Sequence, residues 1–223
     1  QLRTYGYSRG PEWITYGLDA SADLQAVDVQ PVVGHGYRAQ VLHWGMPACT
    51  LELEVPGQHN VRNALAAIAA AVWCDVPIAD ACHALHTYYG VARRFQKLGE
   101  VNAVTVIDDY AHHPTEIQAT LGAARDRFPT QRIWAVFQPH TYSRTRNLLH
   151  EMANSFGAAD HVLVTNIFAA REKDDGSVSA QSLVDASPHP SIRHIGGLVE
   201  SAEYLVESVQ PGDVVLVLGA GDS

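Results

Sequence analysis

The sequence predicts an α/β protein whose later part is built around a mainly parallel sheet. From about residue 91, five apolar segments alternate with segments of helical composition, which is typical of consecutive right-handed βαβ units. Before that point, short segments of alternating polarity indicate antiparallel strands, and two helices follow them. With 223 residues, the chain is long enough for two modest domains, which we expect at residues 1–90 and 91–223.

The first of these regions begins with strands. Gly, Pro, Asp and Ser separate segments of residues 13–55 that alternate in polarity, so we expect antiparallel pairing. The segments are WITYGL, ADLQAVDV, YRAQVLHW and CTLELEV. The next segment, NVRNALAAIAAAVWC, is rich in helix formers and apolar around most of its circumference, which predicts a buried helix. A second helix is expected at roughly 78–88.

The later region contains five expected strands and four expected helices. The strands are AVTVIDDY, RIWAVFQ, HVLVTNI, SIRHIG and DVVLVLGAG, and the helices lie near 114–127, 142–157, 179–186 and 198–208. In a parallel sheet covered by helices on both faces, ligands bind beyond the carboxyl ends of the strands. Polar clusters follow four of these strands, at residues 108–113, 138–146, 166–172 and 219–222. The sequence therefore predicts a binding site at this edge of the sheet.

The composition argues against several classes of protein. A net charge of −9, from 15 basic and 24 acidic residues, argues against non-specific binding of nucleic acid, which needs a basic surface. No apolar run approaches the roughly 20 residues that span a bilayer, and the first residues do not resemble a signal peptide, so we expect a cytoplasmic protein that is not bound to a membrane. Cys49, Cys74 and Cys82 show no Cys-x-x-Cys spacing, which indicates reduced, mostly structural thiols.

Two amides lie at the start of the first helix, in the segment GQHNVRNALAA. Asn60 and Asn63 are three residues apart, so they would share one face of the first helical turn. A side-chain amide offers two donors and one acceptor, which suits the edge of an adenine base. The simpler alternative is that Asn60 caps the helix, and the sequence alone leaves both alternatives open.

Two arginine-containing segments are candidates for binding anions. The Arg93–Arg94 pair stands where the architecture changes, and it is either a contact for nucleotide phosphates or part of an exposed linker. The segment FQPHTYSRTRNL follows a strand and places His140, Arg144 and Arg146 near the start of a helix. Free N–H groups and a partial positive charge at a helix start attract carboxylates and phosphates. We therefore predict an anion pocket there.

The segment VIDDYAHHPTE places two aspartates, a tyrosine and two histidines directly after a strand. His112 and His113, together with the aspartates, have the atoms that a zinc hydrolase would need. Adjacent histidines rarely converge on one ion, however, and the chain contains no His-x₃-His or Cys-x₂-Cys spacing. We therefore predict no metal site among these residues.

Residues 169–180, AAREKDDGSVSA, form a charged stretch that also contains Gly and Ser. This composition is typical of a solvated connector. Since the stretch follows one of the expected strands, the alternative is a mobile lid beside the strand ends.

Several of these segments together resemble motifs of the Mur ligase family. In order, they are GQHNVRNALAA, RRFQKLGEV, DDYAHHPTE, FQPHTYSRT and GAGD, and the resemblance extends from YGYS to GAGD, over nearly the whole chain. FQPHTYSRT is most similar to the branch that adds L-alanine to UDP-N-acetylmuramate, and the muropeptide-recycling branch shares a similar His-His-Pro segment. The resemblance implies that residues 1–90 are the later part of a P-loop-type central ATPase domain and that 91–223 form a Rossmann-like C-terminal domain.

The resemblance implies an ATP-dependent ligase of peptidoglycan synthesis that uses ATP and Mg²⁺. In this family the γ-phosphoryl group of ATP passes to the muramoyl carboxylate, and the amine of L-alanine then displaces phosphate from the acyl phosphate. The Gly-rich P-loop motif does not occur in these 223 residues, so we expect the chain alone to be inactive and the metal ligands to lie mainly upstream. The alternatives are a muropeptide-recycling ligase and a non-catalytic module that binds nucleotide or peptide, and a homodimer is left open.

The resemblance also implies roles for individual residues. The nucleotide would be bound by His59, Asn60, Asn63, Arg94 and Asp109, with Arg94 at the phosphates and Asp109 at the ribose hydroxyl groups. The alanine and muramoyl groups would be bound by Tyr110, His112, His140 and Arg144. Of these residues, Arg94, His112 and His140 are expected to act in catalysis. Many family members have arginine at the position of Thr141, so binding of the alanine carboxylate should depend more on Arg144.

Overall fold

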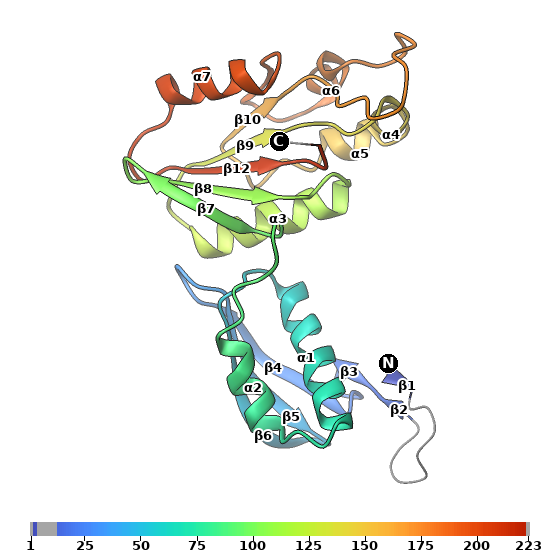
Figure 1. Cartoon of the computed structure of the whole chain (residues 1–223), viewed down its shortest axis with the longest axis vertical. Coiled ribbons are helices and arrows are strands. Elements are labelled where there is room, and N and C mark those ends of the chain that lie inside the picture. The colour runs from blue at the N-terminus through green and yellow to red at the C-terminus, as the bar shows by residue number, and fades with distance from the viewer. Residues whose placement is uncertain (1, 4–12, 222–223) are drawn as a thin grey trace. The chain divides into compact units, whose positions relative to one another are not determined.

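The computed structural model describes residues 2–3 and 13–221 of the chain. The YGYS segment (5–8) and Asp222 of the GAGD segment therefore lie outside the described residues. The chain divides into two compact units, unit 1 (Gln1–Gly90) and unit 2 (Val91–Ser223), which are coloured blue to green and green to red in Figure 1. None of the helices in the described ranges is long and apolar enough to cross a membrane.

Unit 1 contains a four-stranded sheet in the order β3-β4-β5-β6 and a separate pairing of β1 with β2. The strands are β1 (Leu2–Arg3), β2 (Trp13–Ile14), β3 (Tyr16–Gly17), β4 (Leu24–Pro31), β5 (Tyr37–His43) and β6 (Met46–Leu53). β4, β5 and β6 pair antiparallel, as expected, but β3 pairs parallel with β4. The expected WITYGL strand is split at Thr15, because the carboxylate of Asp23 accepts hydrogen bonds from its N–H and its hydroxyl, both at 2.8 Å.

Two helices, α1 (Gln58–Trp73) and α2 (Ile78–His86), cover one face of this sheet (Figure 1). α1 buries its apolar face against inward-pointing strand residues, and these form one core, as in a typical sheet with one packed face. The helix begins after Gly57, whose φ is +95°. This positive φ favours glycine, and a Cβ atom there would lie 2.5 Å from Cε1 of His59, so the exposed His59 ring would also have to move.

Cys49 of β6 and Cys82 of α2 form a disulfide bond, so the expectation of reduced thiols is wrong for this pair. The two residues are 33 positions apart in the sequence, and their Cα atoms are 6.8 Å apart. Their spacing in the sequence carries no signal because the contact arises from the packing of α2 against β6. Cys74 is exposed and carries a free thiol.

Unit 2 is built around a six-stranded sheet in the order β11-β10-β9-β12-β8-β7. The strands are β7 (Gln96–Val101), β8 (Val104–Asp109), β9 (Ile133–Phe137), β10 (His161–Val164), β11 (Ile192–His194) and β12 (Val214–Leu218). β8 to β12 pair in parallel, so the predicted α/β fold with a mainly parallel sheet is confirmed. The carboxyl ends of β8, β9, β10 and β12 consequently meet at one edge.

β7 was not expected from the sequence. It pairs antiparallel with β8 at the edge of the sheet, and its alternation of polarity is weak because both of its faces are largely exposed. Asn102 and Ala103, with φ of 51° and 60°, form the turn between the two strands. Two consecutive positive φ values are typical of the tight turn that suits the twist of a two-stranded hairpin.

The helices of unit 2 are α3 (Pro114–Arg127), α4 (Tyr142–Asn147), α5 (Leu149–Ala153), α6 (Ala180–Ala186) and α7 (Leu198–Ser208). The single helix expected at 142–157 is in fact two short ones, α4 and α5, with the break at Leu148. Residues of α3, α5 and α6 share a core with one face of the sheet, whereas α7 packs on the other face (Figure 1). The expected cover of helices on both faces is therefore present.

Candidate functional site

Four of the six predicted site residues of unit 2 follow the ends of β8 and β9, another lies just before β7, and Asp109 is the last residue of β8. Arg94, Tyr110, His112, His140 and Arg144 form a chain of contacts that we call the strand-end cluster. The guanidinium carbon of Arg94 lies 6.0 Å from the ring centre of Tyr110. Ring centres are 5.2 Å apart for Tyr110 and His112, and 6.0 Å apart for His112 and His140. Nη1 of Arg144 lies 3.3 Å from Nδ1 of His140. The structure thus brings together residues that are up to 50 positions apart in the sequence.

His112 is held in place by the turn that leads into α3. Its Nδ1 lies 2.8 Å from the carbonyl oxygen of Tyr110, which can only accept, so Nδ1 carries a proton, and in the neutral imidazole Nε2 is then the acceptor. The backbone N–H groups of His112 and His113 both donate to Oε2 of Glu116, at 3.1 Å each. Burial raises the pKa of Glu116, but these two N–H donors and the nearby charges outweigh it and lower that pKa. The ionised Glu116 therefore stabilises the helix start, and its Oε2 also lies 3.5 Å from Nδ1 of His112.

His140 is kept neutral by its surroundings. Burial lowers its pKa first, and the positive charge of Arg144 lowers it further, as does His112 whenever that imidazole is protonated, whereas the charge of Glu172 opposes them. The ring stacks on Phe168, with centres 5.7 Å apart. A neutral imidazole has one acceptor nitrogen, so Nδ1 of His140 can accept the hydrogen bond that Arg144 donates.

The cations of α4 differ in their partners. Nη1 of Arg146 donates to Oδ2 of Asp175 at 3.1 Å and to the hydroxyl of Ser177 at 2.9 Å. Arg144 has the neutral His140 as its partner, and no carboxylate of residues 13–221 forms an ion pair with it. Arg144 is therefore the cation of this helix whose charge remains available to a ligand.

The backbone at the start of α4 is already occupied. The N–H of Ser143 donates to Oε2 of Glu172 at 2.8 Å, and the hydroxyl of Ser143 donates to Oε1 of the same carboxylate. These donors lower the pKa of Glu172. The expectation that free N–H groups at this helix start would receive a ligand is thus wrong for Ser143, because a carboxylate of the protein already binds there.

Asp109 is buried, with 5% of its surface exposed. Its carboxylate accepts hydrogen bonds from the N–H of Phe95 at 2.7 Å, the N–H of Ala111 at 2.9 Å and the hydroxyl of Thr120 at 3.2 Å. Burial raises the pKa of Asp109 more than these donors lower it. Both oxygens are engaged within unit 2, and the role of Asp109 at a ribose remains a prediction.

Arg93 is a residue whose position the sequence did not reveal. Its Nε donates to Asp108 at 3.1 Å, and its two terminal nitrogens donate to the carbonyl oxygens of Gly219 and Gly221, both at 2.9 Å. Its guanidinium carbon also lies 5.1 Å from the ring centre of Tyr110. Arg93 thus links the end of β8 to the loop after β12, whereas Arg94 is exposed. Nothing in the Arg-Arg dipeptide distinguishes the two side chains.

No group of three or more His, Cys, Asp or Glu side chains in residues 2–3 and 13–221 is arranged to hold a metal ion. His113 lies at the start of α3, where its Nδ1 accepts a hydrogen bond from the N–H of Thr115 at 3.4 Å. Nδ1 of His113 therefore caps α3, which argues against His113 and His112 binding one metal ion together.

The residues predicted to bind adenine lie at the start of α1, in unit 1. The side-chain N–H of Asn60 donates to the carbonyl oxygen of Pro56 at 2.7 Å, and its oxygen accepts from Asn63 at 3.2 Å. The residue that caps α1 is Gly57, and no side chain caps this helix start. The capping alternative for Asn60 is therefore wrong. His59 and Asn63 are exposed on the same helical turn.

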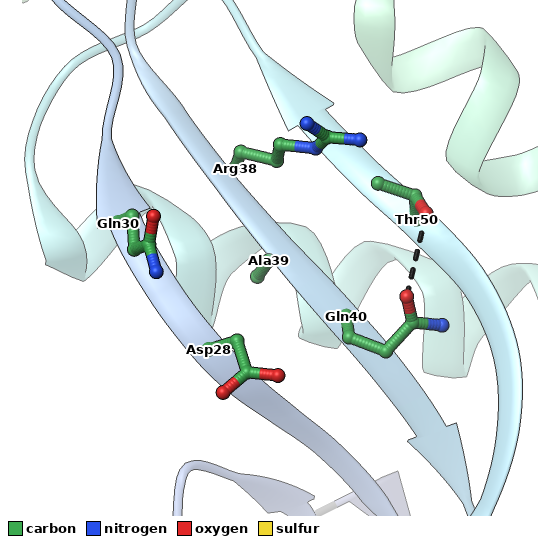
Figure 2. Close-up of a pocket in the computed structure, with 6 residues that line it drawn as sticks. All are labelled: Asp28, Gln30, Arg38, Ala39, Gln40 and Thr50. Carbon is green, nitrogen blue, oxygen red and sulfur yellow. Dashed lines mark hydrogen bonds between the residues drawn. The ribbon is translucent and has the colours of Figure 1, made fainter.

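Unit 1 also has an open pocket of about 250 Å³ on its sheet. It is lined by Asp28, Gln30, Arg38, Ala39, Gln40 and Thr50 (Figure 2). The hydroxyl of Thr50 donates to Gln40 at 3.4 Å, and the side-chain N–H of Gln40 donates to the carbonyl oxygen of Cys49 at 2.9 Å. None of the predicted site residues lines this pocket.

Two family models match the chain: "Mur ligase middle domain" at residues 1–71 and "Mur ligase, glutamate ligase domain" at residues 93–221. Among curated proteins, the UDP-N-acetylmuramate–L-alanine ligases of Alkaliphilus metalliredigens and Salinibacter ruber are 46% and 44% identical to it over 212 residues. These matches cover 94% of this chain but 45% and 44% of the relatives. The chain thus spans slightly less than half the length of the curated relatives it matches.

Solved structures show the same relationship. The UDP-N-acetylmuramate-alanine ligase MurC of Thermotoga maritima has a TM-score of 0.79 and 30% identity, over 94% of this chain and 45% of its own. The murein peptide ligase mpl of Psychrobacter arcticus has a TM-score of 0.60 and 28% identity, over 94% and 43%.

Proposed function

The chain belongs to the Mur ligase family. From this premise we propose that it is part of an ATP-dependent ligase that joins L-alanine to UDP-N-acetylmuramate. In that ligase it would supply the residues that bind alanine and some of those that bind the nucleotide. Curated relatives with that name, at 41–50% identity, support the choice of substrates. The muropeptide-recycling alternative has weaker support, since the murein peptide ligase is less similar in both structure and sequence than the alanine ligase. The reaction would serve peptidoglycan synthesis.

The observation that carries the proposal is the uncompensated charge of Arg144 in the strand-end cluster. A planar guanidinium binds a carboxylate through two parallel hydrogen bonds, and here it is oriented by the neutral His140 at 3.3 Å. Arg144 would therefore bind the carboxylate of L-alanine. Thr141, where many family members have arginine, would leave this task to Arg144.

His112 is the proposed base. The amine of alanine must lose a proton before or as it attacks the acyl phosphate, and a neutral imidazole nitrogen is suited to accept it. Because Nδ1 of His112 donates to Tyr110, Nε2 is the acceptor that would face the amine. Tyr110 and His140 would form the walls on either side of His112.

Arg94 is the proposed contact for the phosphates, since it is exposed and carries a permanent positive charge beside Tyr110. The adenine would be bordered by His59, Asn60 and Asn63. Asp109 would accept hydrogen bonds from the ribose hydroxyl groups. The family's Mg²⁺ does not fit a site built from the described residues alone, since these bring no metal-binding group together. We therefore assign no step of the reaction to the metal.

A chimera tests the proposal. This chain would replace the matching 212 residues of the A. metalliredigens ligase, and phosphate release would be measured. We expect release that requires ATP, UDP-N-acetylmuramate and L-alanine together. The 223-residue chain alone is the background, for which we expect none. A folded chimera whose phosphate release does not depend on L-alanine, or that prefers a muropeptide, would overturn the proposal.

A further inference from the structure

The loop between β10 and α6 binds to α4 through two carboxylates. We call residues 169–177 the acidic loop. Glu172 accepts hydrogen bonds from the N–H and hydroxyl of Ser143, and Asp175 pairs with Arg146 at 3.1 Å. Just before the loop, Phe168 exchanges backbone hydrogen bonds with the chain at Pro139 and Thr141, at 2.8 Å each. The acidic loop, which the sequence left as a connector or a lid, is thus attached to α4 along its length.

These contacts leave one site for an anion at α4. Three groups there attract negative charge: the backbone at the helix start, Arg146 and Arg144. Glu172 and Asp175 compensate the first two. Arg144 has a neutral partner, so it is the group at which the charge of a ligand would be matched.

Glu172 and Arg144 carry opposite charges, and both affect the pKa of His140. The negative charge of Glu172 raises the pKa of His140, and the positive charge of Arg144 lowers it. The contacts place both charges beside that ring: Glu172 accepts from the N–H of Ser143, which directly precedes Arg144, and the His140 ring stacks on Phe168, just before the acidic loop. The hydroxyl and N–H of Ser143 lower the pKa of Glu172 itself, so its carboxylate is ionised at neutral pH.

We propose that Glu172 is a specificity-determining residue, which restricts the strand-end cluster to amino acids with a single carboxylate. This inference rests on the proposed binding of L-alanine at Arg144. One carboxylate is attracted by Arg144, and a second carboxylate on the same ligand meets the fixed negative charge of Glu172. At neutral pH the site therefore accepts L-alanine and disfavours L-aspartate, through repulsion of like charges.

The test is a titration of the full 223-residue chain with L-alanine and L-aspartate, followed by NMR of the Nε–H group of Arg144. For the wild-type chain we expect a dissociation constant about threefold to fivefold higher for L-aspartate than for L-alanine. In Glu172→Gln the ratio should fall to about one, because glutamine keeps an acceptor for Ser143 but removes the charge. Glu172→Asp should restore part of the preference, and Glu207→Gln, which neutralises an exposed carboxylate on α7, should leave it unchanged.

The outcomes separate the two proposals. A loss of preference in Glu172→Gln, with the Arg144 signal still responding to both amino acids, supports the role of Glu172. An unchanged ratio in that variant overturns it and leaves the proposed alanine site standing. If neither amino acid affects Arg144 in the wild-type chain, the alanine site is absent and both proposals fail.

Discussion

Nη1 of Arg144 and Nδ1 of His140 lie 3.3 Å apart, so a permanently charged guanidinium donates to an imidazole that must be neutral to accept. The two side chains therefore depend on each other. Burial and then the charge of Arg144 lower the pKa of His140, and His140 orients Arg144 without cancelling its charge. Both consequences can be measured.

Replacing Arg144 by alanine in the chimera should raise KM for L-alanine by about tenfold to a hundredfold, the range expected for one hydrogen bond to a charged group. The kcat should change less, because the lost contact serves the bound substrate and the transition state alike. The measurement is steady-state phosphate release at varied L-alanine. Arg146→Ala is the matched control, since Asp175 already compensates Arg146. Equal effects of the two substitutions would contradict the role of Arg144.

Arg144→Gln should raise the pKa of His140, which burial and the charge of Arg144 now hold below its ordinary value of 6.5. In the wild-type chain the folded state resists protonation that the unfolded state accepts. The stability from this residue is therefore fully present above pH 6.5 and declines as the pH falls from 6.5 towards the folded pKa. NMR titration of the imidazole nitrogens would give both pKa values. A pKa that does not move in the variant would refute the coupling.

Asp213→Asn should lower the free energy of unfolding of unit 2 by about 2–4 kcal/mol. Asp213 is 4% exposed and accepts hydrogen bonds from Nε and Nη2 of Arg132, at 2.9 and 2.7 Å, and from Nε1 of Trp134 at 3.0 Å. Burial raises the pKa of Asp213, but these donors and the N–H of Gln210 outweigh it and lower that pKa. The stabilisation is therefore present above the ordinary value of 3.8 and is lost as the pH falls through the folded pKa.

Labelling the chain with fluorotryptophan would allow the unfolding of each unit to be measured separately in the Asp213→Asn variant. Trp134 is the single tryptophan of unit 2, and Trp13, Trp44 and Trp73 belong to unit 1. In guanidinium titrations followed by ¹⁹F NMR, the Trp134 signal should shift to a lower midpoint in Asp213→Asn, while the unit 1 signals keep theirs. A Trp134 midpoint equal to that of the wild-type chain would contradict the contribution of the pair.

Removing the disulfide with Cys49→Ser and Cys82→Ser should lower the free energy of unfolding of unit 1 by about 2–4 kcal/mol, because the bond closes a loop over a separation of 33 residues. The Trp44 and Trp73 signals of the same NMR experiment would measure it. Cys74→Ser, which removes the exposed free thiol, is the control. Under non-reducing conditions, mass spectrometry should find one alkylated cysteine in the unfolded wild-type chain. Three would show that the bond is not formed.

The periodicity of the sequence was sufficient for most of the fold. The apolar runs of unit 2 became buried parallel strands, and α3 spans 114–127 as expected because Pro114 and a capping box define its start. Parallel strands align their carboxyl ends, so the meeting of residues after β8 and β9 followed from the predicted topology. The edge strand β7 was not predicted, because a strand that is exposed on both faces shows little alternation of polarity in its sequence.

The contacts that could not be predicted are those between residues distant in sequence. Arg93 and Arg94 are chemically identical neighbours, and only the path of the loop after β12 decides which one turns inward. Glu172 looked like one of several charges in a solvated segment, and its contact with Ser143 depends on the backbone pairing of Phe168 with Pro139 and Thr141. Composition and spacing carry no information on such pairings.

The position of β12 has a consequence for the order in which the molecule can assemble. Val217 of this strand pairs with Asp108 on one side and with Val136 on the other, so the middle of the sheet is made from a late part of the chain. During synthesis on a ribosome, β8 ends 105 residues, and β9 77 residues, before the start of the strand that joins them. Until then β8 and β9 lack the strand that pairs with both of them, and unpaired strand edges can pair with other chains.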